Sequence, residues 1–258
     1  MRADLSGQVV FLTGAAGGIG RATAHRLAAC GASIVVADIN EAGAKEVAAE
    51  LSDALPVAMD VRSAVDAKRA VDATLERYGK IDVLINNAGV NTFKERVNID
   101  RFSEDEWHRI VSIDLDGLYV VSHAALQPMV ARGQGRIVNI ASVIGVAGFR
   151  LQCAFSAAKA GMIHLTRAMA LELGPSGILV NSLAPGSVLT EGTRQLFYGE
   201  DGSFRAQMAG FMNHIPLGRP AHVEEIAEAI LFLCAPQNSY MTGHLMVVDG
   251  GWTAGFIF

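Results

Sequence analysis

Short apolar runs alternate with helix-like segments along almost the whole chain, and this alternation limits the possible folds more than any other feature. The segments expected to form strands are 9–12, 33–37, 56–59, 81–85, 135–141, 178–184 and 244–248. Those expected to form helices are 19–30, 41–51, 63–78, 103–132, 155–173 and 223–234. The strand segments are mainly apolar runs rather than alternating ones, which is typical of strands with both sheet faces covered. Strands that alternate with helices predict right-handed βαβ units and a doubly wound, parallel α/β sheet.

Length and composition predict one globular domain over residues 1–258. The chain has no internal repeat or linker, and its 51% hydrophobic and 18% charged residues suit a large core. A net charge of −5 without a basic patch argues against nucleic acid or an anionic membrane as the main partner. No apolar run reaches the ~18 residues typical of a membrane span, and the polar start of the chain does not resemble a signal peptide.

The cysteines and histidines indicate neither a disulfide framework nor a metal site. Cys30, Cys153 and Cys234 are few and far apart, which favours a reducing, cytoplasmic setting. The seven histidines lack the close spacing of a zinc-binding motif. Cys153 has no suitably placed His in the sequence, so we expect a buried thiol rather than a nucleophile.

Six of the expected strands end at residues of types that often contact ligands. These are Gly14, Asp38, Asp60, Asn87, Ser142 and Pro185. Ligands of doubly wound sheets bind beyond the carboxyl ends of the parallel strands. The six strand ends therefore predict a single site along this edge of the sheet.

The turn after the first strand contains a Gly-x-x-x-Gly-x-Gly pattern made by Gly14, Gly18 and Gly20. Glycines allow a tight turn and close approach of the backbone to a pyrophosphate, next to the N–H groups of a helix start. Asp38 at the next strand end can accept the ribose hydroxyls and repel a 2′-phosphate, and residues 39–40 carry no Lys or Arg. NAD is therefore expected over NADP. The alternatives are a ligand-free turn and an Asp38 that only caps a helix.

Ser142, Phe155 and Lys159 form the second notable group. Phe155 and Lys159 are four residues apart, so they share one helix face. A Tyr at position 155 would have its phenol pKa lowered by the Lys159 ammonium, which would make it an acid/base group near neutral pH. Phe has no proton to give.

The ordered set of motifs resembles the short-chain dehydrogenase/reductase family over essentially the whole chain. The motifs are Thr13-Gly14, Gly18-Ile19-Gly20, Asn86-Asn87-Ala88-Gly89, Ser142 with Lys159, and Pro185-Gly186 followed by Thr190. The resemblance implies a seven-stranded Rossmann-like domain, usually in a homotetramer, that transfers a hydride between a nicotinamide cofactor and an alcohol or ketone. The residues it implies around the cofactor are Gly14, Gly18, Ile19, Gly20, Asp38, Asp60, Val61, Asn87, Gly89, Lys159, Pro185, Gly186, Val188 and Thr190. It also implies that Ser142 binds the substrate oxygen.

Two positions depart from the family pattern. The catalytic Tyr of the family aligns with Phe155, and its helix Asn aligns with Asp114. The resemblance implies that Asp114 helps to hold a water that links Lys159 to solvent, and the alternative is an ordinary helix acid with a partner. Loss of an acid/base group typically costs ~10²–10⁴ in rate, whereas binding can survive because the ring remains.

The intact remainder of the site favours a deliberate Tyr→Phe substitution that impairs turnover in an otherwise active enzyme. A natural, non-catalytic NAD- or ligand-binding protein is the first alternative. A different proton carrier, such as Asp114 or water, is the second.

A polar set of residues is expected around the substrate. Its members are Asn91, Glu95, Ser142, Arg150, Gln152, Glu191 and Arg194. They favour a sugar or polyol, whose hydroxyls need many hydrogen bonds. If they instead face solvent or a subunit interface, Phe149, Leu196, Phe197 and Phe204 predict a pocket for an apolar ketone or acyl substrate. Segment 187–215 is expected to be a lid, and the apolar tail 251–258 to pack at a subunit interface.

Overall fold

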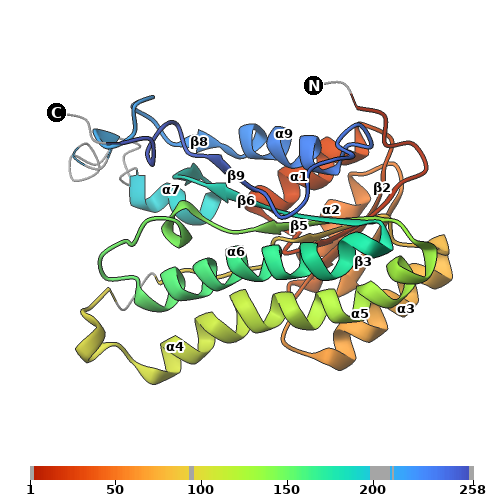
Figure 1. Cartoon of the computed structure of the whole chain (residues 1–258), viewed down its shortest axis with the longest axis horizontal. Coiled ribbons are helices and arrows are strands. Elements are labelled where there is room, and N and C mark those ends of the chain that lie inside the picture. Colours follow the sequence, from red (N-terminus) through yellow and green to blue (C-terminus); the bar gives the residue numbers. More distant parts are fainter. Residues whose placement is uncertain (1–2, 93–95, 198–209, 211, 256–258) are drawn as a thin grey trace.

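The computed structural model describes residues 3–92, 96–197, 210 and 212–255. Its centre is a parallel sheet of seven strands in the order β3-β2-β1-β4-β5-β6-β9 (Figure 1). The strands are β1 Val9–Thr13, β2 Ser33–Asp38, β3 Ala54–Ala58, β4 Val83–Asn86, β5 Gly135–Ile140, β6 Ile178–Pro185 and β9 Leu245–Val248. The predicted doubly wound α/β fold is therefore confirmed. The strand order reverses between β1 and β4, and sheets of this class bind ligands at that point.

Helices cover both faces of this sheet. One layer contains α1 Gly18–Ala28, α2 Glu41–Ala49 and α9 Val223–Cys234. The other contains α3 Ala64–Tyr78, α5 Gly117–Arg132 and α6 Cys153–Leu173. In Figure 1, α1 and α9 lie above the sheet, and α5 and α6 lie below it.

The fully buried strand β1 shows why the strands are mainly apolar runs rather than alternating ones. Successive side chains of a strand point to opposite faces of the sheet. Val10 and Leu12 pack with the α1 and α9 layer, whereas Val9 and Phe11 pack with the α3, α5 and α6 layer. Each face therefore needs its own apolar residues.

The helix ends follow local signals in the sequence. The Ser63 side chain accepts a hydrogen bond from the Asp66 N–H at the start of α3, and Gly79 ends that helix in the left-handed conformation with φ 73°. Ser103 likewise caps α4 Glu104–Val111 by accepting from the Glu106 N–H. The Glu106 carboxylate of the same turn binds the Arg109 guanidinium.

The long helix expected over 103–132 is interrupted in its middle. A π-helical turn, Ser112–Asp116, separates α4 from α5. Such a turn hydrogen-bonds from residue i to i+5 and often occurs at functional sites. Here it contains Asp114, which is only 1% exposed.

A chain of buried hydrogen bonds joins the sheet to α5 and α6. Asn86 of β4 donates to Ser122 Oγ of α5 and to Asn139 Oδ1 of β5. Asn139 in turn donates to Thr166 Oγ1 of α6. Because buried polar groups are costly without partners, these bonds specify how the two helices sit on the strands.

Shorter elements complete the described part of the chain. They are the single turns Ile99–Arg101, Val143–Gly145 and Gly174–Ser176, the paired strands β7 Val188–Leu189 and β8 Ala221–His222, and α7 Glu191–Phe197. Residues 198–209 and 211 of the expected lid lie outside the described residues. None of the helices in the described ranges combines the length and apolar character that a membrane span requires.

Candidate active site

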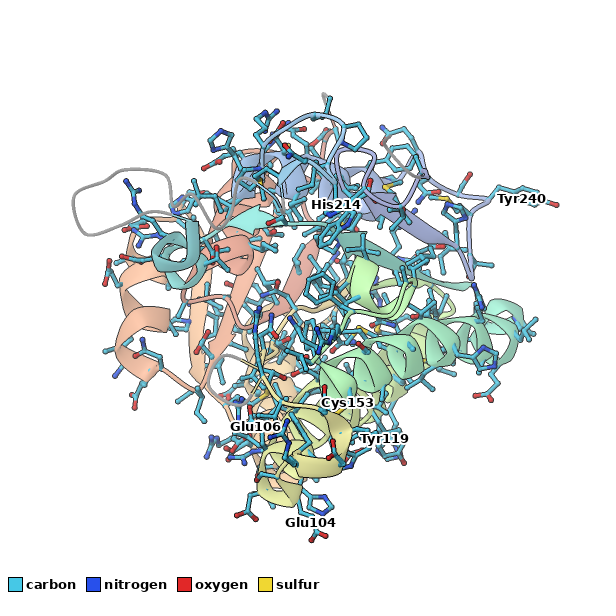
Figure 2. All side chains as sticks on the ribbon, turned by 90° about the vertical axis from the view of Figure 1, so that its left-hand side faces the viewer. Glu104, Glu106, Tyr119, Cys153, His214 and Tyr240 are labelled. Atoms are coloured by element: carbon cyan, nitrogen blue, oxygen red, sulfur yellow. The ribbon has the colours of Figure 1, made fainter. Side chains whose placement is uncertain are left out.

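A cavity of about 870 Å³ lies at the carboxyl ends of β4, β5 and β6. Asn87, Ser142 and Pro185 line it from these three strand ends, and Asp114 and Lys159 line it from the helical layer. Figure 2 looks at this end of the molecule, with Cys153 at the start of α6 and Glu106 on α4. The cavity therefore lies at the edge where the sequence predicts a site.

The glycine-rich turn has the backbone shape of a phosphate-binding loop. Gly14 and Gly18 adopt positive φ values of 63° and 51°, a region that favours glycine. A Cβ atom on Gly20 would lie 2.0 Å from the Gly14 carbonyl oxygen, whereas one on Gly17 would meet nothing within 4 Å. The helix start at α1 has no acidic residue in its first turn and no side-chain cap. Its N–H groups and this open face suit a pyrophosphate.

The Asp38 carboxylate fixes this turn to the end of β2. Its Oδ2 atom accepts a hydrogen bond from the Ala16 N–H, and its Oδ1 atom accepts one from the Asn40 N–H, both at 2.9 Å. A carboxylate oxygen has two acceptor positions, so each can also bind a ribose hydroxyl. Asp38 is not the cap of α2, because Asn40 occupies that position and accepts from the Gly43 N–H.

Asn87 ties the end of β4 to the same turn. Its side-chain amide donates to the carbonyl oxygens of Thr13 and Gly14 at 3.0 and 2.9 Å. The Thr13 hydroxyl accepts from the N–H groups of Asn87 and Ala88. A Cβ atom on Gly14 would lie 2.8 Å from the Ala88 Cα atom, so only glycine permits this approach. Asn87 therefore holds the glycine-rich turn against the end of β4.

Beyond the end of β3, Asp60 forms an ion pair with Arg62 at 2.6 Å. Hydrogen bonding to that guanidinium lowers the pKa of the Asp60 carboxyl, although burial opposes the effect. Val61 packs against Gly117, where a Cβ atom would lie 2.7 Å from its Cγ2 atom. These contacts place the two residues beside the start of α5.

Lys159 and Asp114 form a buried ion pair at the reactive end. The Lys159 Nζ atom lies 3.1 Å from Asp114 Oδ2, and the exposed fractions of the two side chains are 6% and 0%. Lys159 also donates to the Ile140 carbonyl oxygen at 3.1 Å, and Asp114 Oδ1 accepts from the Val90 N–H at 2.8 Å. A Cβ atom on Gly89 would approach both charged groups within 3.3 Å, so glycine keeps this space open.

Ser142 and Phe155 complete the reactive end. Ser142 Oγ accepts a weak hydrogen bond from the Ile144 N–H at 3.3 Å, which leaves the hydroxyl proton for a ligand. Phe155 is 8% exposed and packs against Ile110, with its ring centroid 5.6 Å from Lys159 Nζ. The site thus has a hydroxyl and a cation, but an apolar ring in place of an acid/base group.

The structure brings together some of the residues expected around the substrate and separates others. Asn91, Gln152 and Ser142 line the cavity. Glu191 lines a neighbouring hollow beside Gly18 and Arg21. Arg150 is exposed, and neither it nor Arg194 belongs to the described lining of the cavity. Glu95 lies outside the described residues.

The residues expected around the cofactor also divide into two groups. Those that line the cavity are Ile19, Asn87, Gly89, Lys159, Pro185, Gly186, Val188 and Thr190. The others belong to the glycine-rich turn and the start of α1, to the end of β2, and to the segment that follows β3; they are Gly14, Gly18, Gly20, Asp38, Asp60 and Val61. Together they follow the edge of the sheet from β3 to β6, an arrangement that suits an extended dinucleotide.

Trp252 is a cavity residue that sequence reasoning assigned to a subunit interface instead. It lines the cavity of its own chain and packs edge-on against Phe149, with ring centroids 5.9 Å apart at 90°. Val90 and Ile144 extend this apolar wall. The apolar residues after the last strand indicate in the sequence that the tail packs against something. The surface against which it packs depends on tertiary structure.

Three charged residues of the cavity lining were also not predicted from the sequence; they are Arg96, Glu106 and Arg109. Arg109 binds Glu106 through two nitrogens and donates to the Asn91 carbonyl oxygen at 3.1 Å. Arg96 donates to the Thr92 carbonyl oxygen at 3.1 Å. Within the described ranges, no carboxylate pairs with Arg96, whereas Arg109 and Lys159 each have one.

Comparisons with known proteins agree with this geometry. The family model described as enoyl-(acyl carrier protein) reductase matches residues 14–253. The trans- and cis-4-hydroxycyclohexanecarboxylate dehydrogenases of Sinomonas cyclohexanicum are each 41% identical over 96% of this chain, and the matches cover 93% and 97% of those relatives. The crystal structure of levodione reductase superposes with a TM-score of 0.90 at 34% identity, covering 97% of this chain and 99% of that one.

The matched region contains the glycine-rich turn, the Asn87 turn, Ser142 and Lys159, all placed at one edge of a seven-stranded parallel sheet. The chain belongs to the short-chain dehydrogenase/reductase family of oxidoreductases, whose members act on alcohols and ketones.

Proposed function

We propose that this chain binds NAD and transfers a hydride between that cofactor and the carbon of a secondary alcohol or ketone. The observation that carries the proposal is the presence of Ser142, Lys159 and the helix start at Ile19 in one cavity. The Ser142 hydroxyl donates to the substrate oxygen, and the Lys159 ammonium holds cofactor hydroxyls. The bound dinucleotide supplies the hydride chemistry at its nicotinamide ring.

Asp38 supports NAD over NADP. Its carboxylate is fixed beside the glycine-rich turn by two backbone N–H groups. A negative charge there repels a 2′-phosphate, and no Lys or Arg follows at 39 or 40 to bind one.

Phe155 supports slow turnover with binding retained. Its ring occupies the place beside Lys159 where a phenol would exchange the hydroxyl proton. Loss of general acid/base catalysis lowers the rate by ~10²–10⁴. The volume of the site is nearly unchanged, so cofactor and substrate affinity are expected to survive.

The cavity lining favours an alicyclic alcohol with a carboxylate as substrate. Phe149 and Trp252 offer an apolar wall to a saturated ring. Arg96 is a lining cation without a carboxylate partner in the described part of the chain, which favours an anionic group. Two 41% identical relatives are named for hydroxycyclohexanecarboxylates.

A sugar or polyol is the second candidate. Gln152 lines the cavity, is 2% exposed, and has a side-chain oxygen without a hydrogen-bond partner in the described residues. A buried amide oxygen without a donor is costly, so a hydroxyl from a ligand would stabilise it.

Calorimetric titration of the NADH-bound chain tests the proposal. We expect trans-4-hydroxycyclohexanecarboxylate to bind more tightly than cyclohexanol or sorbitol. Arg96→Leu is expected to lower the affinity for this acid by ~10–100-fold, because a hydrogen bond to a charged group is lost. The same variant should leave the affinity for cyclohexanol unchanged. Arg101→Leu, an exposed arginine of the same segment, is the control.

Three outcomes separate the parts of the proposal. Equal affinity for the acid and for cyclohexanol would contradict the proposal that the substrate carries a carboxylate. Tighter binding of sorbitol would select the polyol candidate. A chain that binds neither NADH nor NADPH would contradict the hydride-transfer function.

A further inference from the structure

Phe155 and Asp114 are the two positions at which the site departs from the family pattern, and both lie against Lys159. The Phe155 ring centroid is 5.6 Å from the Lys159 Nζ atom, and Asp114 Oδ2 is 3.1 Å from it. The two charged side chains are almost fully buried. Solvent and salt therefore screen their interaction little.

The surroundings of Lys159 show what Asp114 does for the protein. A buried ammonium is costly unless an opposite charge and hydrogen-bond acceptors compensate it. Apart from Asp114, the described residues give Lys159 one hydrogen-bond acceptor, the Ile140 carbonyl oxygen. Phe155 adds only the attraction between a cation and a ring. Asp114 is therefore the group that balances the Lys159 charge.

The position of Asp114 is built by the fold. The π turn Ser112–Asp116 brings it into the core, and the Val90 N–H holds its Oδ1 atom at 2.8 Å. Its Oδ2 atom accepts no well-aligned hydrogen bond from the described residues, so its interaction with Lys159 is that of two charges. Gly89 leaves room for both groups.

We propose that Phe155 and Asp114 are a matched pair of departures, in which Asp114 balances Lys159 and so withholds its positive charge from any acid/base group at position 155. A lone cation favours the ionised form of a neighbouring phenol, whereas a neutral ion pair does not. The site is thus adapted to a side chain without a proton at this position. Asp114 is a positioning residue that acts through Lys159.

Other charged groups near position 155 do not replace either partner. Arg109 and Glu106 of α4 face the same cavity and bind each other. The hydrogen bond to Glu106 raises the pKa of the Arg109 guanidinium, with a smaller contribution from the Asp114 charge. Because Arg109 is already paired, Asp114 remains the carboxylate that determines the field at Lys159.

The test is the ionisation of a phenol placed at position 155. It compares the ultraviolet titrations of F155Y, F155Y/D114N and F155Y/D116N. From each curve the titration of the matching variant that keeps Phe155 (the parent, D114N or D116N) is subtracted, so that only the introduced phenol remains. Asn at position 114 has the shape of Asp and keeps an acceptor for the Val90 N–H. Asp116 lies in the same π turn but is exposed, so D116N removes an equal charge away from the site.

We expect the pKa of the introduced phenol to be about 1–2 units lower in F155Y/D114N than in F155Y, from Coulomb interactions at effective protein dielectric constants. F155Y/D116N should titrate as F155Y does. Equal phenol pKa values in F155Y and F155Y/D114N would overturn the proposal. If F155Y/D114N does not fold, F155Y/D114S supplies the same comparison.

Turnover gives an independent measurement and is the only part that rests on the proposed function. At pH 7, F155Y/D114N is expected to reduce NAD with an alicyclic alcohol at least ~10-fold faster than F155Y. If both variants turn over and F155Y is as active as F155Y/D114N, the proposal would also be overturned. The expected pKa difference without turnover in any variant would contradict the proposed function and leave the charge pairing supported.

Discussion

Asp38 supports the nucleotide end of the site in two ways at once. Its two oxygens hold the backbone at Ala16 and Asn40, and its charge faces the place proposed for the adenosine ribose. The sequence predicts its place because it ends a strand. The backbone bonds could not be predicted, because they depend on how the turn at Gly14 and Gly18 folds over β2.

Removal of the Asp38 charge is expected to relax the preference for NAD. Asp38→Asn keeps the side-chain shape but removes the repulsion of a 2′-phosphate. We expect the ratio of the NADPH and NADH dissociation constants to fall by ~10-fold or more, since close charge repulsion of this kind is worth about 1–2 kcal/mol. Both dissociation constants are measured by calorimetry, and a loss of affinity that affects the two cofactors equally cancels in their ratio. An unchanged ratio in Asp38→Asn, as expected for the surface control Asp72→Asn, would contradict this role.

The reactive residues differ in how far the sequence could place them. The sequence could place Ser142 because it follows the end of a strand, and Lys159 because it lies near the start of a regular helix. The direct contact of Asp114 with Lys159 was not predictable, because it needs the π turn. Arg150 and Arg96 both lie in loops, and nothing in their local sequence shows that only Arg96 reaches the cavity.

At the scale of elements, Asp82 connects the start of β4 to its neighbours. This 3% exposed carboxylate accepts from the Val9 N–H of β1. It also pairs with Lys80 and with Arg132 at the end of α5, both at 2.9 Å. Burial raises the pKa of the Asp82 carboxyl, but bonds from Lys80, the Val9 N–H and Arg132 outweigh it and hold the pKa below its usual value.

This lowered pKa predicts how stability depends on pH. A carboxyl with a lower pKa in the folded state stabilises the protein above its unfolded pKa of ~3.9 and loses that effect as pH falls through the folded pKa. Asp82→Asn is expected to cost ~3 kcal/mol at pH 7, because it removes a buried carboxylate that pairs with two partly buried cations. The free energies of unfolding of the parent and of Asp82→Asn are measured in urea at pH 7, 5, 4 and 3, as far as the parent folds. Their difference should be constant from pH 7 to pH 5 and become smaller below about pH 4. A difference independent of pH would contradict this account.

The sequence predicted the strands better than the middle of the long helix. Apolar runs with turns between them define the seven strands, and the topology rules for parallel sheets then restrict their order. The π turn has no comparable signal, because apolar residues continue through Ile113 and Leu115 with helical spacing. It forms because Asp114 finds its partners only in the folded molecule.

For the whole molecule, the described end of the chain returns to the cavity at the carboxyl ends of the strands. Trp252 follows β9 and meets Phe149 from the segment before α6. The expected homotetramer and the contact of the tail with a subunit interface remain predictions. The two roles of the tail are compatible, because a residue can line the cavity of its own chain close to an interface.

Removal of residues 252–258 tests both roles. We expect the truncated chain to bind NADH as before but to lose affinity for alicyclic ligands by ~10-fold or more, since an aromatic wall of the cavity is removed. Light scattering after size-exclusion chromatography should show a tetramer for the parent and a smaller species for the truncated chain. Trp252→Ala separates the roles, because it should weaken ligand binding and leave the mass unchanged. An unaltered mass and thermal stability after truncation would contradict the interface prediction.

The Phe149–Trp252 contact also has a consequence for spectroscopy. The chain has two tryptophans, and the other, Trp107, is 36% exposed on α4 and is absent from the described lining of the cavity. Indole emission depends on the polarity around the ring, so Trp252 should report the replacement of water in the cavity by a ligand. A Trp107→Phe background would leave Trp252 as a single built-in fluorophore, with which cofactor and substrate entry can be followed in a stopped-flow instrument without any label.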